Sequence, residues 1–291
     1  MTGRPDDAML MACTGLEGGV VASGSTCGVV TGGVLSLACA AEHSLLNGAP
    51  GARSAVMERA QGFVRWFEQT YGSCLCRERT GVDFYTPSGQ LRYLVPGDKV
   101  ARCLWHMRGA MRYLYHHRKP EDETAGFTIE PAAPCSSSRG QCGLAVLEGV
   151  RNETGVGNIR LERAAFVFDG GVALSGGVCG ALAGAIMAVN MVLGLQVRRM
   201  SYGGRVASFV RGHANLLRRA DTVAPEPFGV GRKVLKAFKN IAGETECRAI
   251  TGRTFSGEGE FQAHMADAAS PCRNLIQAMI GQASAVVRPF S

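Results

Sequence analysis

Apolar and polar positions follow the period of an α-helix along most of this chain. The clearest stretch is 53–71, where apolar side chains recur every three or four residues between charged ones: Val56, Ala60, Phe63, Val64 and Phe67. Similar patterns predict helices at 7–17, 25–46, 100–117, 139–152, 160–168, 178–197, 202–219, 228–242, 257–268 and 271–286. Residues 80–98 are rich in turn formers and predict irregular chain or a short hairpin. Because no strand-like alternation is sustained, the predicted fold class is all-α.

Two uncharged runs, 18–41 and 170–197, stand out from this pattern. The second is long enough to span a bilayer, but it is dense in small residues and contains Asn190. A Gly/Ala-rich helix buried on all sides of a soluble core explains both runs, so no membrane span is expected. Ser25 or Thr26 is the expected N-cap of the first buried helix.

These two runs are copies of one another. Residues 18–34 and 170–186, which are 152 positions apart, share eight identities in seventeen positions, with Cys27 aligned to Cys179. Seven further matches lie 171 positions apart and include Cys76 with Cys247, while Cys103 has a counterpart in Cys272. The sequence therefore predicts an internal duplication into two related helical domains, 1–117 and 135–291, joined by a Pro-rich linker at 118–134.

Composition narrows the class of protein. The chain has 291 residues, and its eleven cysteines are too many for an ordinary core of this size. The first residues carry no signal-peptide pattern, so the thiols are expected to be reduced and the compartment to be the cytoplasm. The net charge of +7 is spread along the chain without a Lys/Arg run, which argues against nucleic acid as a partner. This charge either covers a solvated surface or docks an acidic electron-transfer partner.

The order of cysteines in the second half resembles the family of redox-active proteins named for the pattern C-GCAxxG-C-C. The four positions fall on Cys142, Cys179, Cys247 and Cys272, and the chain departs from the pattern at Val178, where the family has glycine. The first half resembles the family less completely, since it lacks the leading cysteine. The resemblance implies a redox centre and a distant likeness to the iron–sulfur part of split-Soret cytochrome c. No Cys-x-x-Cys-His is present, so covalent haem is not expected.

A cysteine in the first turn of a helix, after glycines, suits iron ligation. The helix N-terminus favours the thiolate, free N–H groups can bond the sulfur, and glycines such as Gly177 and Gly180 let the backbone approach a cluster. The four second-half cysteines supply the number of thiolates that a [2Fe-2S] or [4Fe-4S] cluster needs. In the first half the candidate ligands are Cys27, Cys76 and Cys103, with Cys74, Cys13 or Cys39 as a fourth, or else this half is a relic without a cluster.

The leading functional prediction is thus an iron–sulfur protein that works in an anaerobic setting. Its expected partner is a larger oxidoreductase or an acidic electron-transfer protein, to which it passes electrons. The chain is expected to act either alone or as a homodimer. Two alternatives stay open at this point: a metal-free thiol–disulfide protein, and a structural subunit with zinc or no metal. Whether the chain is an enzyme does not follow from its residues. The histidines have no haem or metal motif around them.

Overall fold

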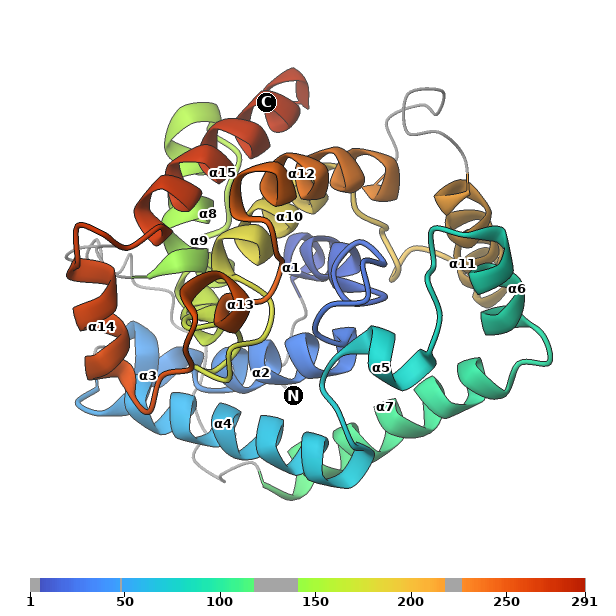
Figure 1. Ribbon diagram of the computed structural model, residues 1–291, viewed down its shortest axis with the longest axis horizontal. Helices are drawn as coiled ribbons and strands as arrows, with labels where there is room; N and C mark the ends of the chain where they lie inside the picture. The colour runs from blue at the N-terminus through green and yellow to red at the C-terminus, as the bar shows by residue number, and fades with distance from the viewer. Residues whose placement is uncertain (1–5, 48, 118–140, 218–226, 291) are drawn as a thin grey trace.

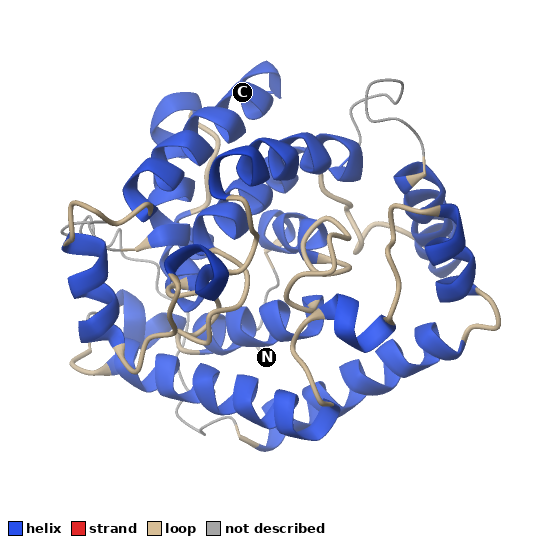
Figure 2. Ribbon diagram, viewed as in Figure 1, coloured by secondary structure: helices blue, strands red, loops and turns tan. Residues whose placement is uncertain are grey.

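The computed structural model describes residues 6–47, 49–117, 141–217 and 227–290, and every regular element in these ranges is helical (Figures 1 and 2). The all-α prediction is confirmed. The first half contains α1 (Asp7–Cys13), α2 (Gly28–Ala40), α3 (Glu42–Leu46), α4 (Ala52–Tyr71), α5 (Cys76–Thr80), α6 (Pro87–Leu94) and α7 (Asp98–His116). The second half contains α8 (Cys142–Thr154), α9 (Ile159–Ala164), α10 (Gly180–Leu193), α11 (Tyr202–Leu216), α12 (Pro227–Ala242), α13 (Cys247–Thr251), α14 (Glu258–Ala266) and α15 (Cys272–Val287).

Two local predictions were wrong. The segment 80–98, predicted as irregular chain or a short hairpin, contains helix α6, whose N-cap Thr86 accepts a hydrogen bond from the Gly89 N–H through Oγ1, with Pro87 at the first helical position. The N-cap of α2 is Cys27 rather than Ser25 or Thr26. Those two residues belong to a short extended segment, in which Thr26 forms an antiparallel bridge with Leu75. The short helices α5 and α13 were not predicted at all.

The helices repeat in the same order in the two halves. Helix α2 corresponds to α10 at an offset of 152, and α4, α5 and α6 correspond to α12, α13 and α14 at an offset of 171. Helix α7 corresponds to α15 through Cys103 and Cys272, and α1 corresponds to α9. Each of α1 and α9 is followed by a 3-10 turn, Thr14–Leu16 or Ala165–Phe168. Helix α8, which carries Cys142, precedes α9 in the second half.

The two halves interlock through these leading helices. Helix α1 of the first half packs on α10 of the second, and α9 with its 3-10 turn packs on α2 of the first (Figure 1). The N-caps of the two leading helices also meet, since the Asn158 side-chain amide donates to the Asp6 carboxylate over 2.7 Å. One hydrophobic core joins both halves, with Val30, Phe63 and Ile186 among its fully buried members. The predicted linker at 118–134 lies outside the described residues, and the predicted domain division stays a prediction.

The central helix α10 is buried along almost its whole length, from Gly180 to Met191. It spans 14 residues. In the part of the chain that the structure describes, no helix has both the length and the apolar character that crossing a membrane requires. The uncharged run of the sequence is therefore explained by close packing: Gly184 lets the α8 backbone come so near that a Cβ there would lie 2.8 Å from the Gly143 carbonyl oxygen.

Candidate redox centre

Each half presents its cysteines from a left-handed turn of the backbone. Residues 18–22 and 170–174, called the left-handed turns below, each contain five consecutive residues with φ between 52° and 81°. Only the first two of each five are glycine; the others are Val20, Val21 and Ala22, and Val172, Ala173 and Leu174. A non-glycine residue in this conformation costs about 1–2 kcal/mol. All six of these side chains are buried, and core packing holds them in place.

The backbone hydrogen bonds of the two left-handed turns match one another. Val21 N–H donates to the Gly15 carbonyl over 2.8 Å and Ala173 N–H to the Val167 carbonyl over 2.7 Å. At the end of each turn the chain leaves in extended form and meets the segment before α5 or α13. Thr26 bridges to Leu75, and Val178 bridges to Glu246. Each left-handed turn thereby fixes where the next cysteine stands.

The short bridges place two cysteines side by side in each half. In the second half, Cys179 N–H donates to the Thr245 carbonyl over 2.8 Å and Cys247 N–H to the Gly177 carbonyl over 2.7 Å. In the first half, Cys27 N–H donates to the Cys74 carbonyl and Cys76 N–H to the Ser25 carbonyl, both over 2.8 Å. These hydrogen bonds are equivalent at the offsets found in the sequence. The duplication is therefore visible in the structure at the level of single hydrogen bonds.

The two bridges also touch each other. Val178 N–H, one residue before Cys179, donates to Thr26 Oγ1 over 2.8 Å, one residue before Cys27. Across the same contact Arg77 pairs with the nearly buried Glu246 at 2.8 Å. The pKa of Glu246 is lowered, although burial opposes this, because Arg77 and Thr245 both hydrogen-bond its carboxylate. The cysteine groups of the two halves are thus joined through a few hydrogen-bonded residues.

All four second-half cysteines begin helices and converge. Cys142, Cys247 and Cys272 are the first residues of α8, α13 and α15, and Cys179 is the N-cap of α10. The Cys142 and Cys272 thiols are hydrogen-bonded to each other, and Cys179 lies within electrostatic reach of Cys142, Cys247 and Cys272. All four are buried. The structure thus brings the predicted second-half set together, one thiol from each of four helix N-termini.

Three of these thiols have raised pKa values and stay protonated. It raises the pKa of Cys179 to about 11 and that of Cys247 well above its usual range. The pKa of Cys142 is raised mainly by its hydrogen bond to Cys272 and further by burial. Cys272 is the exception, because the Cys142 thiol, Ser270 and His264 stabilise its thiolate and lower its pKa. His264 Nε2 lies 3.7 Å from the Cys272 sulfur. Sequence reasoning missed His264, which no motif marks.

A buried acid holds the helix that carries Cys142. Asp169 accepts the Cys142 N–H through Oδ1 over 2.9 Å and binds Arg53 through Oδ2 over 2.9 Å. Arg53 comes from the first half and also binds Glu258 of α14 over 2.9 Å. Burial raises the pKa of Asp169 to about 7, against the lowering by Arg53 and by the Cys142 N–H. The first half thus contributes directly to the second-half site.

The donor set matches what an iron–sulfur cluster requires. Four thiols converge, and the N–H groups of Ala181 and Leu182 point at the Cys179 sulfur, where they favour the thiolate. Glycine makes the close approach possible: a Cβ on Gly171 would lie 2.5 Å from Cys247 Cβ, and one on Gly180 would lie 2.9 Å from Cys142 Cβ. Gly177 acts through its carbonyl, which accepts the Cys247 N–H. These residues fit a thiolate-ligated cluster.

A site for a single metal ion needs its ligands closer together than a cluster does. Among the residues that the structure describes, no three His, Cys, Asp or Glu side chains are grouped closely enough to hold one ion. The ligands of one ion crowd around a single atom, whereas a cluster of two or four irons spreads its thiolates over several metal atoms.

The first half brings Cys27, Cys76 and Cys103 together in the same way. Cys27 and Cys103 both act electrostatically on Cys76, and Val29 and Val30 N–H groups point at the Cys27 sulfur as Ala181 and Leu182 do at Cys179. Burial is the main cause that raises the pKa of Cys76. Cys27 and Cys103 are only half-buried, so this group is more open to solvent than the second-half group.

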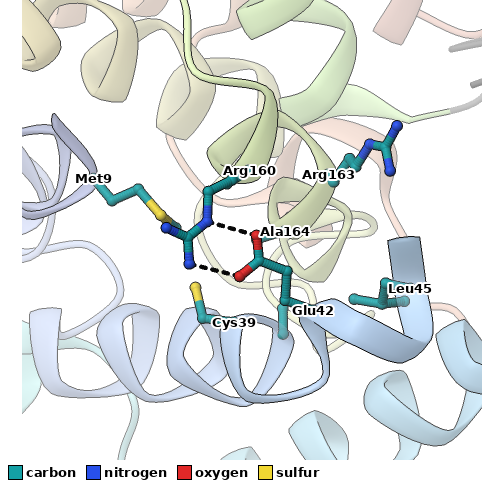
Figure 3. A pocket seen from close by; sticks show the side chains of 8 residues that line it. Met9, Cys39, Glu42, Leu45, Arg160, Arg163 and Ala164 are labelled. Atoms are coloured by element: carbon teal, nitrogen blue, oxygen red, sulfur yellow. Dashed lines mark hydrogen bonds and ion pairs between the residues drawn. The ribbon is translucent and has the colours of Figure 1, made fainter. Parts of the chain in front are cut away.

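The other predicted candidates lie elsewhere. Cys74 is near Cys27, but its thiol donates to the Val64 carbonyl over 3.7 Å. Cys13 and Cys39 are neighbours on α1 and α2, and burial raises the pKa of each to about 12. Cys39 lines a small cavity of about 10 Å³ beside the paired Glu42 and Arg160 (Figure 3). Such a cavity has room for one water molecule at most. Cys13 and Cys39 therefore do not belong to the first-half group.

Comparison with known proteins agrees with this geometry. The family model described as "Putative redox-active protein (C_GCAxxG_C_C)" matches residues 1–114 and 141–286. The chain belongs to this family. The match covers both halves, so the C_GCAxxG_C_C family model extends to the first half. No curated protein and no solved structure matches the chain significantly. As a member of the C_GCAxxG_C_C family, the chain is a redox-active, cysteine-rich, all-α protein.

Proposed function

We propose that this protein binds an iron–sulfur cluster through Cys142, Cys179, Cys247 and Cys272 and acts as an electron-transfer protein. The single observation that carries this proposal is the convergence of four buried thiols from four helix N-termini. Isolated buried thiols gain nothing from such an arrangement, whereas four thiolates are what a cluster requires. When bound, the cluster supplies a one-electron couple.

The residues around the four cysteines favour this use. On binding, each thiol gives up its proton, and the N–H groups of Ala181 and Leu182 are placed to stabilise the Cys179 sulfur. Asp169 and Arg53 fix the Cys142 end of α8, while His264 and Ser270 hydrogen-bond Cys272. Burial of all four cysteines excludes water from the site, which protects a cluster from hydrolysis.

The test of the ligand set uses a matched pair of cysteine variants. Cys179→Ser should abolish the visible absorbance and the iron of the second-half site in the anaerobically purified protein. Cys39→Ser, which changes a half-buried helical cysteine outside both groups, should leave them unchanged. If Cys179→Ser keeps the same iron content and spectrum as the unaltered protein, Cys179 is not a ligand.

The proposed partner is an acidic electron-transfer protein or an oxidoreductase with an acidic docking face. Helix α7, which carries Cys103 of the first-half group, exposes Leu104, Trp105 and Met111 beside Arg108 and Arg112. An exposed apolar strip flanked by arginines suits a transient partner of opposite charge, because such charges mainly raise the association rate. The cytoplasm and an anaerobic setting remain parts of this proposal.

A second candidate function rests on the hydrogen bond between Cys142 and Cys272. In the metal-free protein the Cys272 thiolate would attack a disulfide substrate and release one thiolate, and Cys142 would then displace the second. Two electrons and two protons pass to the substrate, and a Cys142–Cys272 disulfide remains. A two-electron thiol couple in iron-free protein, lost in Cys142→Ser, would support this candidate in place of the cluster.

A further inference from the structure

An open cavity of about 340 Å³ lies where the C-terminal end of α4, helix α5 and helix α7 come together (Figure 1). The proposed function makes no use of this cavity. Its charged lining residues are Arg79 and Glu78 of α5 and Arg102 of α7, and His106 of α7 lies beside them. A volume of this order is large enough for a small organic ligand.

Arg79 brings a positive charge to this cavity. Its guanidinium carbon lies 4.5 Å from the centroid of the Phe67 ring and 5.4 Å from that of Tyr71. Its Nε and Nη1 atoms are buried, and neither has a hydrogen-bond partner in the described part of the chain. An aromatic face attracts a cation but leaves its N–H donors unsatisfied. The charge of Arg79 thus has no counter-ion on Nε or Nη1 among the described residues.

His106 adds a second polar atom without a partner. The residue is 8% exposed, and its Nδ1 atom is buried with no hydrogen bond to any described residue. Its ring centroid lies 4.3 Å from that of Tyr71. Gly109 makes room for this tyrosine, since a Cβ there would lie 1.9 Å from the Tyr71 hydroxyl oxygen. Because glycine destabilises a helix relative to alanine, α7 loses stability where it accommodates the aromatic wall of the cavity.

The other charged groups leave the cavity with a net positive charge. Arg102 is exposed, and its Nη2 atom lies 3.9 Å from Asp98 Oδ2, at the outer limit of an ion pair. Glu78 is the carboxylate of the lining, and the Ser73 hydroxyl donates a hydrogen bond to it over 2.6 Å. Two guanidinium groups therefore face one carboxylate, which is already hydrogen-bonded. Such a balance favours an anion as the ligand.

The second half shows that the fold does not require this basic lining. At the offsets of the duplication, Ile250 stands in place of Arg79, Pro271 in place of Arg102 and Leu275 in place of His106. Leu275 is 2% exposed and belongs to the hydrophobic core. Equivalent helices thus form with uncharged side chains at these three positions. The two arginines and the histidine are specific to the first half, and packing alone does not account for them.

We infer that this cavity binds a small oxyanion, a carboxylate or phosphate group, with Arg79 and Arg102 as its charged contacts and His106 as a hydrogen-bonding contact. The planar guanidinium group matches the oxygens of both kinds of anion. A bound oxyanion gives the Arg79 charge a counter-ion beside the aromatic rings. The inference goes beyond the proposed function and does not depend on it, because no cysteine takes part.

The experiment measures anion binding to the full chain by isothermal titration calorimetry. Inorganic phosphate and succinate are titrated separately at constant ionic strength, with chloride as the background anion. The variants are Arg79→Gln, Arg102→Gln and Glu78→Gln, and the control is Arg65→Gln, an exposed arginine of α4 outside the cavity lining. Circular dichroism verifies folding. Because Arg102 is exposed, Arg102→Gln decides the question if Arg79→Gln does not fold.

At least one of the two anions should bind with a dissociation constant of about 1 mM or lower. Arg79→Gln should weaken this binding about tenfold or more and Arg102→Gln about threefold, whereas Glu78→Gln should strengthen it about threefold by removing a like charge. Binding of phosphate alone, of succinate alone or of both supports the site and identifies the kind of oxyanion. Binding of neither, or unchanged binding in both Arg79→Gln and Arg102→Gln, would overturn the inference. Equal weakening by Arg65→Gln would also overturn it, because net charge would then explain the effect.

Discussion

The left-handed turns make a quantitative prediction about alanine-to-glycine changes. Ala173 lies in the second left-handed turn and Ala188 lies in the middle of α10; both are buried, at 1% and 0% exposure. Replacing Ala188 by glycine removes a buried methyl, worth about 0.8 kcal/mol. It also loses about 1 kcal/mol of helix propensity. Ala188→Gly should therefore lower the free energy of unfolding by about 2 kcal/mol.

At Ala173 the same change to glycine also relieves backbone strain, which opposes the loss of stability. The lost methyl and the greater freedom of glycine in the unfolded chain together cost about 1.5 kcal/mol. Relief of the positive φ of 54° returns about 1–2 kcal/mol. The two nearly cancel, so Ala173→Gly should leave the free energy of unfolding almost unchanged. Urea unfolding followed by circular dichroism measures both variants under identical conditions. Equal losses in the two variants would refute the claim that Ala173 is strained.

Two further predictions concern pH and salt. Burial lowers the pKa of His213 from 6.5 to about 4, so the unfolded chain takes up a proton at this residue before the folded chain does. The free energy of unfolding should therefore fall by up to about 3 kcal/mol as the pH drops from 6.5 to 4. His213→Phe should flatten this dependence in urea unfolding, whereas the exposed His116→Phe should not. Electron transfer to an acidic partner protein should slow as ionic strength rises, and an Arg108→Gln/Arg112→Gln variant should flatten that dependence in stopped-flow traces. A salt-independent rate in the unaltered protein would remove α7 as the docking face.

Features encoded by local periodicity and by residue identity were predictable from the sequence. The helical spacing of apolar residues in α4 places that helix to within a residue at its start. The duplication follows from matching cysteines and glycines, and the structure repeats it hydrogen bond by hydrogen bond. The grouping of Cys142 with Cys272 could be expected from the family resemblance, although no local signal brings these residues together.

Features that depend on tertiary contacts could not be predicted in this way. Val172 and Val20 have no intrinsic preference for positive φ, and only the packed core around them explains their conformation. The exchange of α1 and α9 between the halves leaves no periodic trace in the sequence. Asp169 lies in no motif, and its role becomes visible only beside the helix N-terminus that it binds. The N-cap signal of α6, Thr86 followed by Pro87, is present in the sequence and could have predicted that helix.

The central claim is that the converging cysteines hold iron and sulfide. The most direct measurement is anaerobic purification of the full chain, followed by iron and acid-labile sulfide analysis, visible absorption and EPR on one sample. The account predicts a brown protein with iron and sulfide in equal, stoichiometric amounts and an EPR signal on reduction or oxidation. A colourless, iron-free protein that also resists reconstitution would contradict it and would shift the weight to thiol chemistry at Cys142 and Cys272.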